Sequence, residues 1–383
     1  MSDNSKIKND PYVKHQSFTD FSVDANINEE LIHKLDYVKK SVESHEDSYH
    51  KEVVDKALSC IADENNQTFS LHPNTIEEIK KIKKEELADY LFYRYRYEVF
   101  PTEKTLDDYP PCIQIEPVSI CNYRCVFCYQ TDPKLSDPKY GHMGTMDVDL
   151  FKNIIDQIEG KVQAVTLASR GEPMIHKNID QILKYMEGKF LASKINTNAS
   201  LLTEAKAHAI LEADIKTLVF SADSADVNSY SKLRVRGDLN KVLKNVKMFH
   251  EIKEKHYPQS NLITRVSGVK VNEEQNIDDM TGFWGDYVDQ VAFVQYNPWE
   301  NVYDTNLKDE TNACTDLWRR MFVWWDGIVN PCDIDYRSEL QVANAKDVDI
   351  KEAWTGKGYN ALREKHLNKN RKQCSPCDRC HFV

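Results

Sequence analysis

From about residue 113 onward, short apolar segments alternate with longer amphipathic ones. Strand-like segments are predicted at 113–120, 162–168, 190–196, 215–221, 262–270 and 291–296. Apolar residues at helical spacing predict the intervening helices at 147–158, 178–187, 203–213, 239–255 and 277–287. Such alternation is typical of βαβ units and a parallel sheet. Because the crossovers are right-handed, six of these units are expected to curl into a barrel or part of one.

The segments on either side follow different patterns. Residues 1–110 are polar and helical, with apolar residues at helical spacing in 30–42 and 75–96 and no clear strand alternation. We expect a helical extension there, with a disordered start. After about residue 300 the alternation stops, and two apolar runs flank Asp326-Gly327, which indicates a hairpin of 321–325 and 328–330.

These patterns predict an α/β protein with three parts. They are a helical N-terminal extension (1–110), a partial (β/α)6 TIM-like barrel (111–300) and a small cysteine-rich domain (301–383). The last part holds too little apolar material for a core of its own, so we expect metal ligation to stabilise it.

Composition limits the function. The formal net charge of -11 disfavours binding to a nucleic-acid backbone. No run of 18 apolar residues predicts a membrane span, and the polar start does not resemble a signal peptide, so a cytoplasmic location is expected. The chain has 10 cysteines, most of them in two groups, and in a reducing compartment such groups suggest metal ligation more than disulfides.

The first group is Cys121, Cys125 and Cys128, in the loop after the first predicted strand. That loop lies at the carboxyl end of a parallel strand, where barrel active sites collect. Three thiolates can hold three irons of a [4Fe–4S] cluster and leave the fourth iron open for a cofactor. The alternatives are a zinc knuckle or chance clustering, but zinc prefers four closed ligands and this loop contains no fourth Cys or His.

The spacing of this group, with Phe127 just before the third cysteine, resembles that of the radical SAM superfamily, and the resemblance covers about residues 113–300. It implies that S-adenosylmethionine (SAM) binds the open iron and is cleaved reductively to a 5′-deoxyadenosyl radical. It also implies the residues that bind SAM, which follow successive strands: Gly171 and Glu172, Asn198, Ser221, and Arg234 or less favourably Arg236.

Two of these motifs depart from the family pattern. Arg170 replaces the first glycine of the family's glycine-glycine-glutamate-proline segment, and Ala199 replaces the glycine after Thr197-Asn198. For Arg234 and Arg236, a surface ion pair is the alternative to a contact with the SAM carboxylate. Gln295, Tyr296 and Asn297 are further candidates for contact with adenine or substrate.

The second group comprises Cys314, Cys332, Cys374, Cys377 and Cys380. It resembles the SPASM and twitch extensions of radical SAM enzymes, which hold auxiliary [4Fe–4S] clusters. A full SPASM domain has seven cysteines, so five favour one auxiliary cluster. Cys314 and Cys332 are the firmer ligands, and two of the remaining three complete the set. A structural zinc ribbon is the alternative.

The resemblance predicts hydrogen abstraction from a small molecule, by oxidation or rearrangement of a sugar, an aminocyclitol or a related polyol. Modification of a ribosomally made peptide or a protein side chain is the alternative, and a non-enzymatic metal-binding scaffold is a second one. The expected partners are the substrate and a reducing electron donor such as flavodoxin or ferredoxin, with neither nucleic acid nor membrane.

Overall fold

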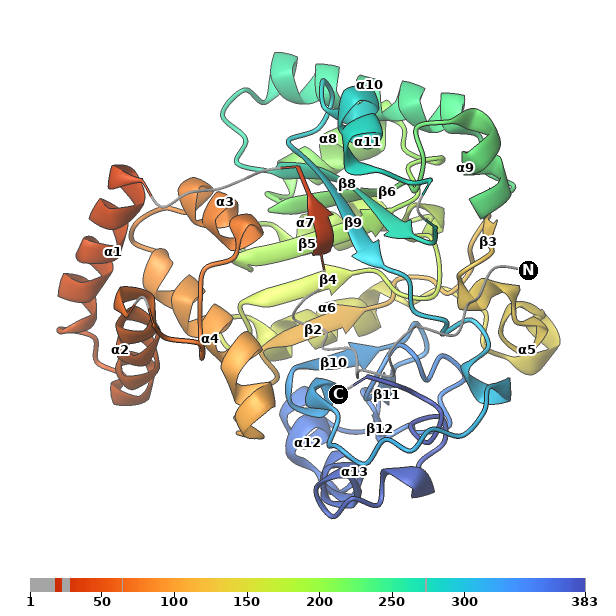
Figure 1. Ribbon diagram of the computed structural model, residues 1–383. Coiled ribbons are helices and arrows are strands. Elements are labelled where there is room, and N and C mark those ends of the chain that lie inside the picture. Colours follow the sequence, from red (N-terminus) through yellow and green to blue (C-terminus); the bar gives the residue numbers. More distant parts are fainter. Residues whose placement is uncertain (1–17, 23–27, 64, 273, 383) are drawn as a thin grey trace.

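The computed structural model describes residues 18–22, 28–63, 65–272 and 274–382. They form one sheet in the order β1-β9-β8-β6-β5-β4-β2-β10-β11-β12, which curves through the centre of the molecule (Figure 1). Six neighbouring strands are parallel, as the sequence predicts: β2 (Cys112–Ile115), β4 (Ala164–Leu167), β5 (Ala192–Thr197), β6 (Thr217–Ser221), β8 (Ile263–Lys270) and β9 (Gln290–Gln295).

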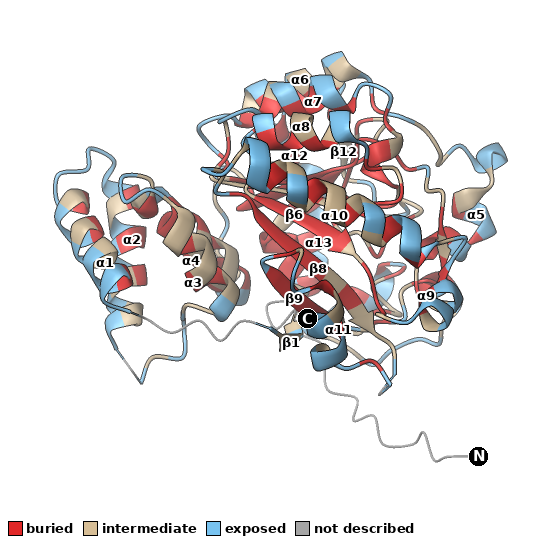
Figure 2. Ribbon diagram, turned by 90° about the horizontal axis from the view of Figure 1, so that it is seen from above, coloured by how far each residue is buried: buried red, intermediate tan, exposed pale blue. Residues whose placement is uncertain are grey.

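Helices cover the convex face of this sheet. They are α6 (Val148–Ile158), α7 (Ile179–Met186), α8 (Glu204–Glu212), α10 (Leu239–His256) and α11 (Ile277–Trp284), each at a position where the sequence predicts a helix. In Figure 2 the faces of the outer helices that turn toward the strands are buried, and the opposite faces are exposed. The apolar core therefore lies between strands and helices, and the concave face is left for polar residues. The partial barrel is confirmed.

The N-terminal extension is helical, as predicted, and has a core of its own. It consists of α1 (Glu29–Val42), α2 (Ser48–Ala62), α3 (Pro73–Lys81) and α4 (Leu87–Glu103). The segment 75–96, which carries apolar residues at helical spacing, is divided between two helices, because α3 ends at Lys81. Lys34 of α1 donates to the carbonyl oxygens of Ile79, Lys80 and Ile82 at 3.2, 2.7 and 3.3 Å, and so caps this helix end from outside.

The expectation that residues 1–110 contain no strand is wrong. β1 (Phe18–Phe21) pairs antiparallel with the edge strand β9. Four residues are too few to show an alternating pattern, and the strand exists because β9 offers its unpaired backbone groups. The disordered start expected before it falls on residues 1–17, which lie outside the described part of the chain.

The C-terminal part extends the same sheet. The predicted hairpin is confirmed as β10 (Arg320–Val323) and β11 (Ile328–Asn330), and β10 continues the sheet by pairing parallel with β2. The region also contains β12 (Ala343–Asn344), α12 (Ile350–Thr355) and α13 (Lys357–Leu367). The strands of the barrel and of the cysteine-rich region therefore share hydrogen bonds.

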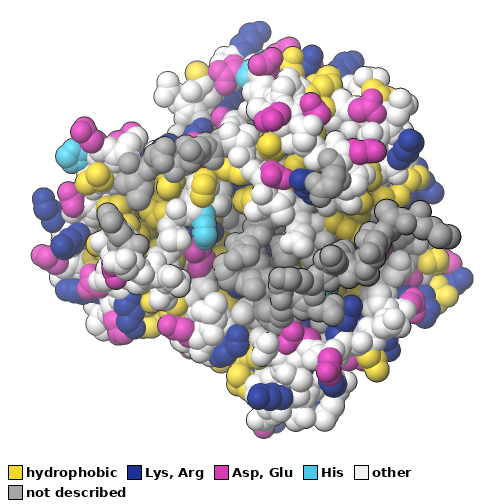
Figure 3. Space-filling view, viewed as in Figure 1, with side chains coloured by type: hydrophobic (Ala, Val, Ile, Leu, Met, Phe, Trp, Pro, Cys, Tyr) yellow, Lys and Arg dark blue, Asp and Glu magenta, His cyan; other side chains and the backbone are white. Residues whose placement is uncertain are grey.

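Smaller elements complete the chain. Between the strands and helices above lie β3 (Arg124–Cys125), α5 (Pro133–Ser136), α9 (Val227–Leu233) and β7 (Arg234–Val235). No helix within the described ranges is long and apolar enough to cross a membrane. Acidic and basic side chains are interspersed over the face drawn in Figure 3.

The external cap on α3 can be tested by substituting Lys34. We expect Lys34→Met to lower the free energy of unfolding by about 1.5–3 kcal/mol, because a charged hydrogen bond donor to three carbonyls is lost. Urea unfolding followed by circular dichroism measures the change. Lys39→Met, at an exposed position of the same helix, is the control and should change it much less. Equal effects of the two substitutions would show that the cap is not stabilising.

Candidate active site

The three cysteines of the first group lie together at the carboxyl edge of the sheet. The chain leaves β2 at Ile115, so the predicted strand 113–120 is shorter than expected, and the following loop carries the cysteines. β3 within this loop pairs with β7, and the Trp299 indole donates to the Phe127 carbonyl at 3.0 Å. Cys121, Cys125 and Cys128 thereby gather in one small cluster with Tyr123 and Phe127.

The donor set of this cluster fits iron–sulfur ligation. Burial raises the pKa of the Cys121 thiol to about 12 and also raises the pKa of Cys125 and Cys128. Buried thiolates therefore need nearby cations. Two sulfurs on one zinc ion lie no more than about 4.6 Å apart. The sulfur atoms of Cys121, Cys125 and Cys128, all of them described residues, do not all lie within 4.8 Å of one another. The spacing suits a multi-iron cluster better than one ion.

Glu172 lies behind this cysteine loop and is 2% exposed. Its carboxylate accepts hydrogen bonds from the Met174 amide (3.0 Å), the Thr197 hydroxyl (2.6 Å) and the Asn198 amide (2.7 Å). It therefore joins the loops after β4 and β5. Burial raises the pKa of Glu172, while these hydrogen bonds oppose the rise. The Asn198 side chain in turn donates to Asn122 at 3.0 Å, next to Cys121.

Gly171 lies against the segment that precedes Cys121. A Cβ atom at this position would come within 2.2 Å of the Val118 carbonyl oxygen and 2.6 Å of the Ile120 carbonyl oxygen. The next amide, of Glu172, donates to the Ile120 carbonyl at 3.0 Å. The glycine is thus required for direct backbone contact between the loop after β4 and the cysteine loop.

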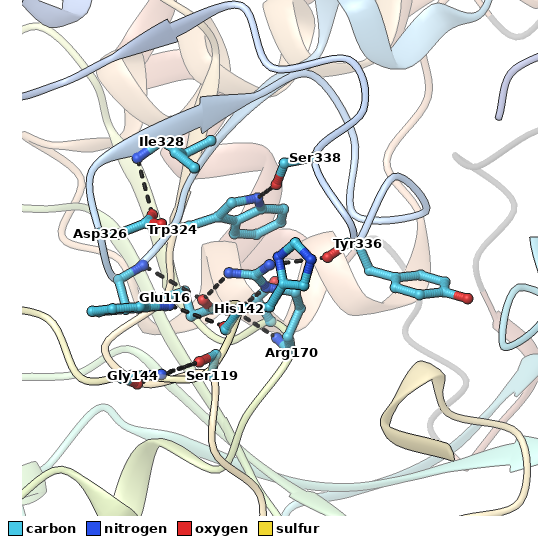
Figure 4. Close-up of polar contacts among 12 residues, drawn as sticks. Glu116, Ser119, His142, Gly144, Arg170, Trp324, Asp326, Ile328, Tyr336 and Ser338 are labelled. Carbon is cyan, nitrogen blue, oxygen red and sulfur yellow. Dashed lines mark hydrogen bonds and ion pairs between the residues drawn. The ribbon is translucent and has the colours of Figure 1, made fainter. Parts of the chain in front are cut away.

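Arg170 is buried and holds a further contact between these loops (Figure 4). Its guanidinium donates to both oxygens of Glu116, at 2.8 and 2.6 Å, and its backbone amide donates to the same carboxylate at 3.0 Å. A third guanidinium nitrogen donates to the Tyr336 carbonyl at 2.9 Å, and the group lies over the Trp324 ring at 4.4 Å. The arginine that departs from the family pattern therefore ties the barrel to the cysteine-rich region.

Arg234 lies beside the cysteine trio and is 6% exposed. It pairs with Asp223, with Nε 2.5 Å from one carboxylate oxygen, and one guanidinium nitrogen lies 3.9 Å from the Cys125 sulfur. The Asp223 carboxylate raises the pKa of Arg234 against the effect of burial. Ser221 ends β6 nearby, and its hydroxyl has no hydrogen-bond partner among the described residues. Arg236, the less favoured alternative, is exposed.

The second group of cysteines lies in the C-terminal region. Burial raises the pKa of Cys377 well above its usual range, and Cys314, Cys374 and Cys380 are the thiols close enough to raise it further. Cys380 and Cys332 border a second apolar cluster, which Cys128 also contacts. Cys314, Cys374, Cys377 and Cys380 are thus brought near one another, although 60 residues of sequence separate Cys314 from Cys374. Cys332 contacts the apolar cluster that contains Cys380.

A cavity of about 910 Å³ follows the concave face of the sheet. Alternate residues of the parallel strands line it, including Asn196 and Ser267 near the strand ends and Lys194 and Arg265 one inward-facing position deeper. Gln295 and Asn297 also line it, whereas the Tyr296 hydroxyl donates to Glu300 at 2.5 Å. Helices α3 and α4 and strand β1, from the N-terminal region, close one side of the cavity.

Sequence reasoning missed three cations on the strands that line this cavity: Lys194, Arg265 and Arg320. Lys194 and Arg265 lie within predicted strands, and Arg320 lies one residue before the predicted strand 321–325. Parallel strands that are covered on both faces are usually apolar throughout. A charged residue inside such a strand was therefore the signal that could have identified these positions. Burial next to Arg320 lowers the pKa of Lys194 to about 8.

Comparison with known proteins agrees with this geometry. A family model of the radical SAM superfamily matches residues 115–279, and a model of the SPASM iron–sulfur cluster-binding domain matches residues 314–381. The chain therefore carries a radical SAM domain followed by a C-terminal SPASM domain. Its cofactors are therefore SAM, the [4Fe–4S] cluster that binds SAM, and auxiliary iron–sulfur ligation in the C-terminal domain.

Individual relatives are distant. The chain is 22% identical over 324 residues to the tungsten-containing aldehyde ferredoxin oxidoreductase cofactor-modifying protein of Pyrococcus furiosus, covering 71% of this chain and 89% of that protein. It is 27% identical over 190 residues to a GTP 3′,8-cyclase of Clostridium botulinum, covering 49% and 56%. The crystal structure of Streptococcus suis SuiB bound to its precursor peptide SuiA matches with a TM-score of 0.55 at 15% identity, over 92% of this chain and 89% of that one. This likeness shows the fold.

The backbone contact at Gly171 predicts a selective defect. In Gly171→Ala the added methyl group collides with backbone carbonyls, so the cysteine loop must shift. We expect the paramagnetic resonance signal of the SAM-binding cluster to weaken, while that of the C-terminal site is retained. Gly282→Ala, at a position with open space around it, is the matched control and should leave both signals unchanged. Full retention of the first signal in Gly171→Ala would contradict the prediction.

The pair of Arg170 and Glu116 predicts a strong energetic coupling. Removing one partner leaves a buried charge unpaired, and we expect Arg170→Met or Glu116→Gln to lower the free energy of unfolding by about 3–5 kcal/mol. The double variant should lose less than the sum of the two, as measured by urea unfolding. Arg236→Met, at an exposed position, is the control. Purely additive losses would refute the coupling.

Proposed function

We propose that this enzyme abstracts a hydrogen atom from a small polyhydroxylated molecule held in the cavity, and that it oxidises or rearranges that molecule. The observation that carries this proposal is the cavity on the concave face of the sheet. Its volume of about 910 Å³ falls within the range of about 300–1,000 Å³ that is usual for small-molecule sites. Its walls carry polar and charged side chains among aromatic and aliphatic ones, and β1, α3 and α4 close its side.

The proposed site for the radical chemistry is the edge where the cysteine trio meets this cavity. A cluster held by Cys121, Cys125 and Cys128 supplies, when bound, the electron that splits SAM into methionine and a 5′-deoxyadenosyl radical. Tyr129 connects the two regions, because it follows Cys128, lines the cavity and donates its hydroxyl to the Ser169 carbonyl at 2.8 Å. A substrate in the cavity is thus adjacent to the trio.

Several residues are proposed to hold SAM. The Ser221 hydroxyl is available to the SAM carboxylate, and Arg234 contributes positive charge next to it although Asp223 already binds this guanidinium. Gly171, Glu172 and Asn198 form the wall behind the trio. Because three protein donors already bind the Glu172 carboxylate, its proposed role includes fixing the loops in addition to accepting from the SAM ammonium.

One auxiliary [4Fe–4S] cluster is proposed in the C-terminal domain. Cys314 and Cys332 are its firmer ligands, together with two of Cys374, Cys377 and Cys380. Its proposed task is to accept the second electron of a substrate oxidation. The second apolar cluster, which contains Cys380 and borders Cys332, also contacts Cys128, so the two cysteine groups are near neighbours.

Two sets of cysteine variants test this division of roles. After anaerobic reconstitution we expect about eight irons per chain for two clusters. Replacing Cys121, Cys125 and Cys128 with Ala should abolish 5′-deoxyadenosine formation under dithionite, because no iron site for SAM remains. Replacing Cys314 or Cys332 should block substrate turnover while leaving SAM cleavage. Cys60→Ala, outside both groups, is the control and should behave as the wild type.

The substrate class is tested with fractionated cell extract and 5′-deoxyadenosine as the readout. We expect the stimulating activity in the small-molecule filtrate and expect it to survive protease treatment. Activity confined to the retained, protease-sensitive fraction would instead support modification of a peptide. Unchanged 5′-deoxyadenosine formation in the triple cysteine variant would overturn the enzymatic proposal altogether.

A further inference from the structure

The inner face of the barrel carries three cations, two of which lack acidic partners. Lys194 of β5, Arg265 of β8 and Arg320 of β10 all line the cavity. Neither Lys194 nor Arg265 forms an ion pair with a described carboxylate, and the Lys194 ammonium forms no hydrogen bond with a described residue. Arg265 is 6% exposed, and its printed hydrogen bond goes to the neutral Gln290 side chain at 2.7 Å.

The acidic residues on the opposite wall are already engaged. Glu78 accepts a hydrogen bond from the Tyr90 hydroxyl at 2.5 Å, and Glu98 is paired with Arg94. Asp20 lies 3.4 Å from the Lys270 ammonium. These carboxylates are therefore bound to other groups. Asp333 also lines the cavity, and Tyr97, Asp316 and Asp333 raise the pKa of Arg320 against the effect of burial, so its charge is partly compensated. Lys194 and Arg265 have no such ion-pair partner among the described residues.

Arg265 is buried, whereas Lys194 and Arg320 are half-buried. Unpaired charge away from water is costly, and such cations are normally paired with an anion. Here the cations also repel one another: burial lowers the pKa of Lys194, and the charges of Arg320 and Arg265 lower it further. Such an arrangement is unfavourable in an empty cavity and becomes favourable when an anion enters. Perturbed groups of this kind gather at functional sites.

We infer that the substrate carries an oxyanion group, a carboxylate or a phosphate, which Lys194 and Arg265 bind from the inner face of the barrel, with Arg320 adding positive charge. This inference rests on the proposed function and narrows its substrate to acidic sugars, sugar phosphates or similarly charged polyols. Lys194 precedes Asn196 by two residues, and Arg265 precedes Ser267 by two residues. Two residues span about 7 Å along a strand. The oxyanion is therefore bound deep in the cavity, and the hydroxylated part of the substrate extends toward the rim.

The anion site is tested directly by calorimetry on the reconstituted full-length enzyme. Inorganic phosphate and malonate are the probes, at constant ionic strength in chloride, and neutral malonamide is the control ligand. We expect at least one of the two anions to bind and malonamide not to bind. Phosphate alone indicates a phosphorylated substrate, and malonate alone indicates a carboxylic acid. Absence of binding by both anions would overturn the inference.

Variants assign the binding to the named residues. Lys194→Met and Arg265→Gln should each weaken binding of the anion about tenfold or more, because each removes a charged hydrogen-bond donor. Lys194→Arg should restore most of the affinity lost in Lys194→Met. Lys241→Gln, at an exposed position of α10, is the matched control and should bind as the wild type. If one variant fails to fold, the other still decides, and unchanged affinity in a folded variant would refute the assignment.

The natural substrate gives an independent readout. Activity in the small-molecule filtrate, detected as 5′-deoxyadenosine, should be retained by an anion-exchange resin at neutral pH. Activity in the unbound fraction would overturn the inference and leave the proposed hydrogen abstraction intact. Anion binding without any 5′-deoxyadenosine would instead support the site and overturn the proposed function. The two proposals therefore fail in different experiments.

Discussion

The site depends on close backbone contact between the loop that follows β2 and the loop that follows β4. Gly171 lies so close to the carbonyls of Val118 and Ile120 that no side chain fits. The buried pair of Glu116 and Arg170 fixes the same two loops beside this contact, and Arg170 also reaches the Tyr336 carbonyl. One set of interactions thus positions the cysteine trio, the wall proposed to hold SAM and the C-terminal domain relative to one another.

The two faces of the sheet carry different kinds of side chain. On the convex face, apolar strand residues pack against helices and supply the main core. On the concave face, polar and charged side chains line a cavity that the N-terminal helices close. Cations without acidic partners are unfavourable for the free protein and favourable for binding an anion. The stability of the fold therefore comes largely from the convex face, and binding is assigned to the concave face.

Much of the architecture was predictable because parallel strands and amphipathic helices leave strong periodic patterns. All six parallel strands and the five outer helices occur where they were expected, with ends shifted by a few residues, most of all in 113–120. The differences fall where a distant segment decides the local structure. Lys34 ends α3 from another helix, and β1 forms because the edge of β9 is available.

By itself the sequence determined the partial barrel, the hairpin and the residue types for iron–sulfur ligation, because local spacing and periodicity encode them. It also placed Arg170 and Arg234 near the site but gave no partners for them. Only the tertiary structure paired Arg170 with Glu116 and Arg234 with Asp223, and only it brought Lys194, Arg265 and Arg320 to one cavity. These contacts join residues far apart in the chain, and their geometry exists only after the strands have assembled.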